Sequence, residues 1–436
     1  MEFETLKKSH LKRNIIIGVV AVLIISAVIL NFTRARYRVT QSIDLVNGTI
    51  NYTLPDLNIV GLYIDGAEAT KLDSSKTYTL DTIQSTCTYK DGSEIVDLTI
   101  SYDSETGGLS ISPYTTKGTK CTLYFDETVL VRDALLANYP TQLTRSSFSS
   151  TVTNTTTGTI YYEDTSKGTT YYFAGNPTDN WVKFANKYWR IIRINEDGSL
   201  RLIYQGTSAN TTGTGTQTET STFSINGITD DNNAYVGYMY TLGSLRGTTT
   251  DSGIKKKLDT WYQNNLSSYA DDLDGNAGFC GDRTPSTSSS STNNQGGTGT
   301  TETYYGGYIR LITNKQPTFE CPDGDLYTTK GSEDGNKALQ YPIGLITADE
   351  VVYAGGSWLS NNSSYYLYTG QNYWTMSPSY FRATGGDAVV FNVSSTGRLI
   401  NTYVNNTIGV RPVVNLKSSV QITGGNGSSR NPYVIS

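Results

Sequence analysis

Two stretches near the C-terminus decide the fold: YWTMSPSYF at residues 373–381 and GVRPVVNL at residues 409–416. Both combine proline with aromatic or β-branched residues, whereas Thr, Ser, Asn and Gly dominate the rest of the chain. Such side chains favour strands, and a proline, which lacks an N–H, belongs at the start or the edge of one. The second stretch therefore predicts a strand with Pro412 at its start or edge, and the first predicts Trp374 and Met376 as core residues.

The segment between these stretches predicts a β-hairpin, because AVVFNV at 388–393 and RLINTYV at 398–404 are two strand-like runs joined by a short turn. Arg411 can bond several carbonyl oxygens through its planar fork, which would lock the last strand to the preceding loops. Ligand binding is the alternative role for this arginine. We expect four residues to fasten the fold: Trp374, Pro378, Arg411 and Pro412.

The composition favours a mostly β protein with minor α content, an α+β fold class in which strands dominate. The 436 residues are enough for two or three domains. Only 17% of them are charged and 33 are tyrosine, a profile typical of β-rich extracellular proteins. The net charge of −5 leaves no broad basic surface, so we expect no nucleic-acid partner. GGTGT at 296–300 has no following lysine and predicts no nucleotide site.

The N-terminus predicts a membrane anchor. Residues 15–32 form an almost unbroken apolar run flanked by KKSHLKR and RARYR, just long enough to cross the hydrocarbon core as a helix. We expect a cytoplasmic tail at 1–13, a single transmembrane helix at 14–32 that places the protein in the cell membrane, and the bulk of the chain outside the cell. A cleaved signal peptide is the alternative, although the run is longer than such peptides need.

The four cysteines predict disulfides. They are even in number and match no C-x-x-C metal or redox spacing. Three pairings are possible, of which we favour the neighbour pairing because it would staple one loop in each of two domains. That pairing joins Cys87 to Cys121 and Cys280 to Cys321.

Beyond the anchor, the pattern predicts two folded domains. Residues 39–130 contain regularly spaced, short β-favouring runs, typical of a small immunoglobulin-like β-sandwich that would act as a spacer. Residues 131–159 are expected to be a linker, and 160–436 a second domain. Two low-complexity segments of that domain cannot build a core and are expected to be solvated loops, at 208–224 and 283–303.

Three local elements stand out in the second domain. Two aromatic and β-branched runs joined by an Asp-Gly turn predict a hairpin over 188–206. Apolar residues at helical spacing predict a helix over 252–266. A capping box of Thr347 and Glu350 predicts a second, shorter helix that ends near Gly355.

The part of the chain expected outside the cell lacks the usual residues of acid-base catalysis. The only histidine, His10, precedes the predicted anchor, so no catalytic triad and no His-ligated metal site can form there. We expect no enzymatic activity, although two carboxylates in a cleft could still hydrolyse a glycan. The motif DDLDGN resembles a truncated calcium loop without its closing glutamate. We interpret it as an acidic turn and expect no cofactor, with structural calcium as the alternative, held by Asp271, Asp272 and Asp274.

Tyrosine is the residue type in excess, and aromatic residues crowd the segment 362–381. Tyr and Trp supply contact area at low entropic cost, while alternation along a strand buries every second side chain. We expect about half of this cluster to be core. The residues Tyr380, Phe381 and Arg382, in a turn-rich stretch, are expected to be exposed contacts.

In their order, the motifs YWTMSP, AVVFNV, GVRPVVNL and NPYVI resemble the closing segment of the C-type-lectin-like fold in its formylglycine-generating-enzyme branch. The motifs WRIIRIN, IKKKLDTWY, FCGDR, YGGYIRL and GLITADEVVYAGG extend the resemblance over residues 160–436, to membrane-anchored surface proteins of Firmicutes and Mollicutes. Members of this fold that display variable side chains on their closing loops imply six ligand-binding positions in this chain: Tyr380, Phe381, Arg382, Arg398, Asn401 and Tyr403.

The resemblance implies a fold rather than an activity. Gln316-Pro317-Thr318 lacks the acid that calcium-dependent sugar sites carry. The catalytic cysteines of formylglycine-generating enzymes have no counterpart near the C-terminal motifs, because Cys280 and Cys321 lie upstream.

Together these features predict a non-catalytic cell-surface protein for ligand binding or adhesion, whose partner is an extracellular protein or a glycan. Two alternatives stay open: a carboxylate-dependent enzyme acting on surface glycan, and a structural or tip subunit of a surface appendage. A pocket with two carboxylates would favour the enzyme, whereas an exposed aromatic patch would favour binding.

Overall fold

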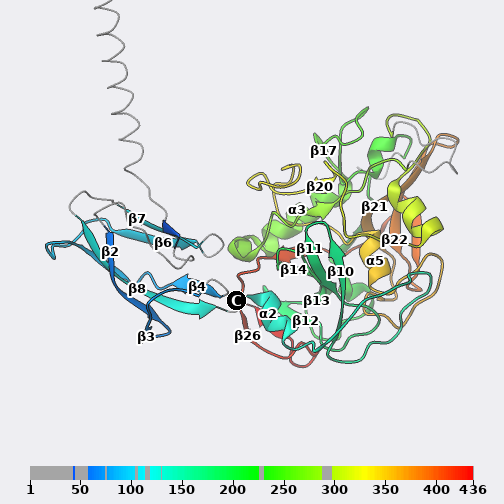
Figure 1. Cartoon of the computed structure of the whole chain (residues 1–436). Coiled ribbons are helices and arrows are strands. Elements are labelled where there is room, and N and C mark those ends of the chain that lie inside the picture. The colour runs from blue at the N-terminus through cyan, green and yellow to red at the C-terminus, as the bar shows by residue number, and fades with distance from the viewer. Residues whose placement is uncertain are drawn as a thin grey trace, which may run out of the picture. The chain divides into compact units, whose positions relative to one another are not determined.

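The computed structural model shows a chain built mostly of β-strands with a few short helices, which confirms the expected fold class (Figure 1). The structure describes residues 43–44, 57–73, 76–103, 107–112, 118–128, 130–224, 230–286 and 297–435.

Two compact units divide the chain, Met1–Val129 and Leu130–Ser436. The expected cytoplasmic tail at 1–13 and transmembrane helix at 14–32 lie outside the described residues. None of the helices in the described ranges is long and apolar enough to cross a membrane.

The N-terminal unit consists of two sheets that enclose one core. In the larger sheet β8 is central: β2 pairs with it in parallel along one edge, while β4 and β5 pair antiparallel along the other. Leu123 and Phe125 of β8 pack with Ile100 and Leu109 of the smaller sheet, so the two sheets form the expected β-sandwich. The larger sheet contains β2 (Leu57–Ile64), β3 (Ala67–Glu68), β4 (Thr77–Leu80), β5 (Thr86–Tyr89) and β8 (Thr119–Thr128), and the smaller contains β1 (Ile43–Asp44), β6 (Thr99–Asp103) and β7 (Gly108–Ser112).

The cysteines form the predicted neighbour pairing. Cys87 and Cys121 lie directly opposite each other on β5 and β8 and are joined by a disulfide, and Cys280 is joined to Cys321. These bridges close loops of 34 and 41 residues, each worth about 3–4 kcal/mol in the chain-entropy model. All four cysteines of the chain are therefore oxidised.

The first large sheet of the C-terminal unit has nine strands, in the order β26-β27-β12-β13-β11-β10-β9, with β14 pairing both β13 and β25. The hairpin predicted over 188–206 is β13–β14, turned by Gly198 at φ 83°. The strands are β9 (Thr141–Leu143), β10 (Thr159–Thr165), β11 (Gly168–Tyr172), β12 (Trp181–Phe184), β13 (Lys187–Ile194), β14 (Leu200–Gly206), β25 (Val413–Leu416), β26 (Ile422–Gly424) and β27 (Tyr433–Ile435).

The second large sheet has six strands, in the order β15-β24-β21-β22-β23, with β19 also pairing β21. The hairpin predicted over 388–404 is β22–β23. Pro378 lies inside β21, and the register with β22 shifts on both sides of it because proline cannot donate to the ladder. The strands are β15 (Glu219–Ser221), β19 (Thr303–Tyr304), β21 (Tyr373–Arg382), β22 (Asp387–Val393), β23 (Leu399–Tyr403) and β24 (Ile408–Val410).

One apolar core joins these two sheets. Trp189 and Leu202 of the nine-stranded sheet belong to the same buried cluster as Trp374, Met376 and Val390 of the six-stranded sheet. The placement of Trp374 and Met376 in the core is therefore confirmed.

Short helices complete this core. The predicted first helix is α3 (Gly253–Asn265), which Ser252 caps by accepting a hydrogen bond from the Lys255 N–H. The predicted second helix is α5 (Ala348–Tyr353), and its capping box between Thr347 and Glu350 is present. A further helix, α2 (Val131–Leu136), begins the unit.

The prediction of a linker at 131–159 is wrong, because this segment belongs to the C-terminal unit. Val131, Leu135 and Tyr139 are buried in its core, and the Tyr139 hydroxyl donates to the Asp179 carbonyl at 2.6 Å. The three side chains recur every fourth residue, so they share one face of a short helix and its C-terminal extension.

The two low-complexity segments are also less solvated than expected. In 208–224, β15 pairs with β24 and the Ser221 carbonyl accepts a hydrogen bond from the Trp374 indole at 2.9 Å. In 283–303, Arg283 is buried and donates to the Met239 carbonyl at 2.8 Å, although 287–296 lie outside the described residues.

Arg411 and Pro412 form the connection between the two large sheets, since β24 ends at Val410 and β25 begins at Val413. The fully buried guanidinium of Arg411 donates to the Tyr204 carbonyl at 3.0 Å and to Gln205 Oε1 at 2.9 Å, both of β14. It also donates to the Leu367 carbonyl at 3.3 Å and lies 4.7 Å from the centre of the Tyr373 ring of β21. Arg411 therefore makes several hydrogen bonds to the strand and loop that precede it, as a structural role requires.

We expect Arg411→Lys to lower the free energy of unfolding by about 3 kcal/mol, because an ammonium cannot reproduce the fork and leaves buried acceptors unpaired. Urea unfolding of the full chain measures this loss. Arg398→Lys is the control, since Arg398 is not fully buried and its loss should change stability by less than about 0.5 kcal/mol. Equal stability of the two variants would contradict the role of Arg411.

Candidate functional site

Strand register brings part of the predicted site together. Tyr304 of β19 pairs with Tyr380 of β21, Tyr380 pairs with Val389 of β22, and Val389 pairs with Tyr403 of β23. Directly paired residues on neighbouring strands point to the same face of a sheet. A row of tyrosines therefore crosses the end of the six-stranded sheet.

Two rings of this row contact each other and a third ring, that of Tyr308. The ring centres of Tyr304 and Tyr380 are 5.8 Å apart, and Tyr308, from the short helix α4 (Gly306–Tyr308), lies 4.8 Å from Tyr304 and 5.9 Å from Tyr380. The guanidinium of Arg382 lies 4.8 Å from the centre of the Tyr380 ring. We refer to this group as the tyrosine surface: Tyr304, Tyr308, Tyr380, Arg382 and Tyr403.

The outer members of the tyrosine surface reach solvent. Tyr403 is 41% exposed and Arg382 is exposed, whereas Tyr304 and Tyr308 are half-buried and Tyr380 is only 9% exposed. Burial raises the pKa of Tyr308 and of Tyr380, so both hydroxyls keep their protons at neutral pH and can donate hydrogen bonds. The surface thus combines flat rings, hydroxyl groups and one cation.

The expectation that Phe381 is an exposed contact is wrong, because its side chain is fully buried. Phe381 pairs with Ala388 and Thr303, and alternation along β21 turns its ring to the face opposite Tyr380. The turn-rich sequence that follows suggested a loop here, but β21 continues to Arg382.

The other two predicted positions have local partners. Asn401 is half-buried, and its amide donates to the Ser379 hydroxyl at 2.8 Å. Arg398 precedes β23 at the end remote from Tyr403, and its Nε donates to Asn361 Oδ1 at 2.5 Å. The structure therefore brings together Tyr380, Arg382 and Tyr403, with Asn401 beside them, and separates Arg398 from them.

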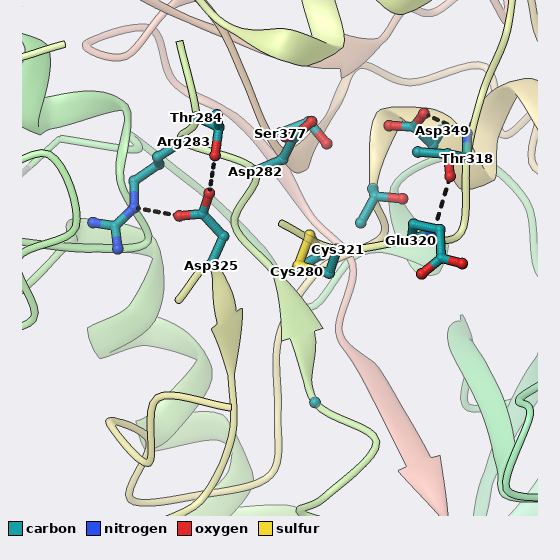
Figure 2. Close-up of a disulfide and its surroundings, with 12 residues drawn as sticks. Cys280, Asp282, Arg283, Thr284, Thr318, Glu320, Cys321, Asp325, Asp349 and Ser377 are labelled. Atoms are coloured by element: carbon teal, nitrogen blue, oxygen red, sulfur yellow. Dashed lines mark hydrogen bonds and ion pairs between the residues drawn. A yellow bond between two sulfur atoms is a disulfide. The ribbon is translucent and has the colours of Figure 1, made fainter. Parts of the chain in front are cut away.

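A second candidate is a cavity of about 280 Å³ beside the disulfide of Cys280 and Cys321. Cys280 is the last residue of strand β18 (Phe279–Cys280), which forms a two-stranded antiparallel sheet with β20 (Leu326–Tyr327). Figure 2 shows the disulfide between two polar groups, one made by Arg283, Thr284 and Asp325 and the other by Thr318, Glu320 and Asp349.

Arginine and carboxylate pairs build the wall of this cavity. Arg310 binds Asp349 with two parallel hydrogen bonds of 2.8 and 2.7 Å, and its Nη2 also donates to Asp282 at 2.6 Å. Glu350 accepts from Arg193 at 3.1 Å and lies 2.5 Å from Arg201. Each buried carboxylate of the wall is therefore neutralised by a guanidinium.

The pairing sets the protonation of two carboxyl groups. Burial acts to raise the pKa of Glu350, but the charges of Arg201 and Arg193 outweigh it and lower the pKa. Burial raises the pKa of Asp282 to about 6 against the opposing charge of Arg310. Glu350 is therefore ionised at neutral pH, whereas the pKa of Asp282 lies just below neutral pH.

Sequence reasoning missed this cavity. The sequence predicts only a capping role for Glu350, and Glu350 does accept the Thr347 N–H at 2.9 Å as a capping residue. The same carboxylate also holds the two arginines of β13 and β14. A usable signal is the presence of three arginines, Arg190, Arg193 and Arg201, in the predicted hairpin, because such charges on strands of a buried sheet require partners.

The acidic turn interpretation agrees with the geometry around DDLDGN. Asp274 Oδ1 accepts the N–H groups of Asn276 at 2.6 Å and Ala277 at 3.3 Å, an Asx turn. Within the ranges that the structure describes, no group of three or more His, Cys, Asp or Glu residues is arranged to hold a metal ion.

Asp282→Asn should change the pH dependence of stability. Because folding raises the pKa of Asp282 from 3.8 to about 6, the native state binds more protons than the unfolded chain between these values, and this carboxyl's contribution to stability falls as pH rises. The free energy of unfolding of the wild type, measured relative to the variant, should fall by up to about 3 kcal/mol between pH 4 and pH 7.

Chemical denaturation at several pH values measures this difference. Asp323→Asn is the matched control, because Asp323 lines the same cavity but is exposed, and its profile should run parallel to that of the wild type. If the stability profile of Asp282→Asn also ran parallel to that of the wild type, Asp282 would be ionised over the whole pH range measured, and the prediction would be wrong.

Comparison of the chain with family models, with curated proteins and with solved structures finds no match. The function is therefore argued from the side chains themselves.

Proposed function

We propose that this protein is a non-catalytic ligand-binding or adhesion protein of the cell surface. The tyrosine surface carries the proposal, because it presents several contacting rings and a cation at one edge of a sheet. Tyrosine and arginine are enriched among the residues that dominate the energetics of binding surfaces. The tyrosine ring gives a large contact area with few rotatable bonds, and the arginine guanidinium gives several hydrogen-bond donors.

Two observations support a place outside the cell. All cysteines are oxidised, and structural disulfides persist in oxidising compartments. The apolar run at 15–32 supports an N-terminal transmembrane helix as the single anchor, with the bulk of the chain extracellular. The β-sandwich of the N-terminal unit suits a spacer of immunoglobulin-like type, and the C-terminal unit a C-type-lectin-like domain.

The partner that fits the tyrosine surface is an extracellular protein or a glycan. Tyrosine rings stack on the apolar faces of sugars as readily as they pack on protein side chains, and their hydroxyls serve either partner. The chain's acidic net charge gives no reason to propose nucleic acid or nucleotide as a partner.

The cavity carboxylates favour a second candidate, an enzyme acting on surface glycan. A glycosidase needs one carboxyl that gives a proton and another that attacks or activates water. The raised pKa of Asp282 suits the first role. However, Asp349 and Glu350 are 5% and 3% exposed and bound by arginines, which leaves them poorly placed for the second role, so we favour binding.

Tyr403→Ala and Arg382→Ala should each weaken binding of the ligand at least tenfold, because each removes a solvent-reaching member of the tyrosine surface. The full chain is screened on protein and glycan arrays, and the hit is then titrated against both variants. Arg398→Ala, at the other end of the β22–β23 hairpin, should leave the affinity unchanged.

Two results would count against this proposal: the same affinity for all three variants, or turnover of an arrayed glycan by the wild type. Thermal unfolding of each variant shows that a loss of binding does not come from a loss of fold. Tyr380→Ala is less suitable as a test, because its ring is almost fully buried.

A further inference from the structure

The cavity beside the disulfide has the size of a small-molecule site. Its volume of about 280 Å³ is just below the range of about 300–1,000 Å³ for ligand pockets, which suits a ligand of few atoms. It is walled by β13, β14 and α5 on the inside and by the segments 165–167 and 318–324 on the outside. The disulfide fixes the second outer segment, because Cys321 lies within it and Cys280 lies on β18.

Guanidinium edges face this cavity more than carboxylates do. The side chain of Arg310 is 22% exposed, whereas its partners Asp282 and Asp349 are each 5% exposed. Arg310 uses Nε and Nη2 for these partners, and none of its hydrogen bonds to the described residues involves Nη1. The two carboxylates thus hold the guanidinium and leave Nη1 for a ligand.

Arg193 repeats this arrangement. Its side chain is 12% exposed against 3% for Glu350, to which its Nε donates. Its Nη1 contacts Thr170 and Glu196, so Nη2 is without a partner in the part of the chain that the structure describes. Each of the two guanidinium groups thus keeps one nitrogen, Nη1 of Arg310 and Nη2 of Arg193, that can donate a charge-assisted hydrogen bond to a carboxylate oxygen.

The rim of the cavity carries a net negative charge, because its exposed charged side chains are Glu320, Asp323 and one cation, Lys167. Glu320 and Asp323 are both exposed, and Glu320 is oriented by the backbone N–H and the hydroxyl of Ser166 at 2.6 and 2.9 Å. Over the whole lining, six carboxylates outnumber four cations. A ligand with negative charge alone is therefore disfavoured, whereas one that also carries a positive charge matches both parts of the site.

From this geometry we propose that the cavity binds a small zwitterion of the α-amino-acid class. The ligand's carboxylate accepts hydrogen bonds from Nη1 of Arg310 and Nη2 of Arg193, and its ammonium group contacts the rim at Glu320 and Asp323. Phe319 also lines the cavity, but its ring stacks on Tyr353 and lies 4.9 Å from the Arg193 guanidinium, so its edge is what it offers to the ligand's side chain. This site is separate from the tyrosine surface and does not depend on the function proposed for it.

Calorimetric titration of the full chain with a panel of the common free amino acids tests the proposal. At least one should bind, and its affinity should fall at least tenfold when its carboxylate is converted to an amide or its amine is acetylated, because each change removes one of the two charges. Absence of binding by the whole panel, or equal binding by both derivatives, would overturn the proposal.

Two variants assign the binding to this cavity. Glu320→Gln should weaken binding of the free amino acid at least tenfold but leave the weak binding of the acetylated form unchanged, since only the first carries an ammonium group. Glu333→Gln, an exposed glutamate outside the cavity lining, is the matched control and should have no effect. Unchanged affinity in Glu320→Gln would place the ligand elsewhere, as would a loss of affinity in Tyr403→Ala.

Discussion

The two-residue connection Arg411-Pro412 is the constraint on which the C-terminal unit depends. It carries the chain from the six-stranded to the nine-stranded sheet, and so short a connection fixes the spacing of the sheets. A buried cation at this point is tolerated only if its donors are satisfied. The carbonyls of Tyr204 and Leu367 and the face of Tyr373 provide that environment. One side chain therefore ties the two sheets and a loop to the connection.

Other charged side chains of this unit follow the same rule. Lys255 is 2% exposed and forms ion pairs with Asp251 and Asp259. Glu350 begins α5 and also neutralises two arginines. Because breaking one partner of such a group leaves a buried charge, the Glu350 pairs require α5 to pack against β13 and β14, whereas the Lys255 pairs act locally on α3. The cavity beside the disulfide lies where two such ion pairs, Arg310 with Asp349 and Arg193 with Glu350, are partly exposed to solvent.

Local elements could be predicted from the sequence because their signals are local. Hairpin turns, capping residues and helical spacing lie within a few residues, as the hairpin at 188–206 and Ser252 show. The burial of Phe381 could not be predicted, because it depends on β21 continuing past a proline with a shifted register. The cavity and the contribution of Tyr304 were missed for a similar reason, since β19 joins β21 across about 75 residues of chain.

The segment from Tyr304 to Arg310 belongs to both candidate sites. Tyr304 and Tyr308 face the tyrosine surface, while Arg310, two residues beyond, faces the cavity. Gly307 lies between them, where an added Cβ would come within 3.3 Å of Asp282 Oδ2 and 3.7 Å of the Pro378 carbonyl. A side chain at position 307 would therefore force the Asp282 carboxylate to shift by a few tenths of an ångström. The absence of a side chain at Gly307 lets the segment lie against both β21 and the arginine pairs.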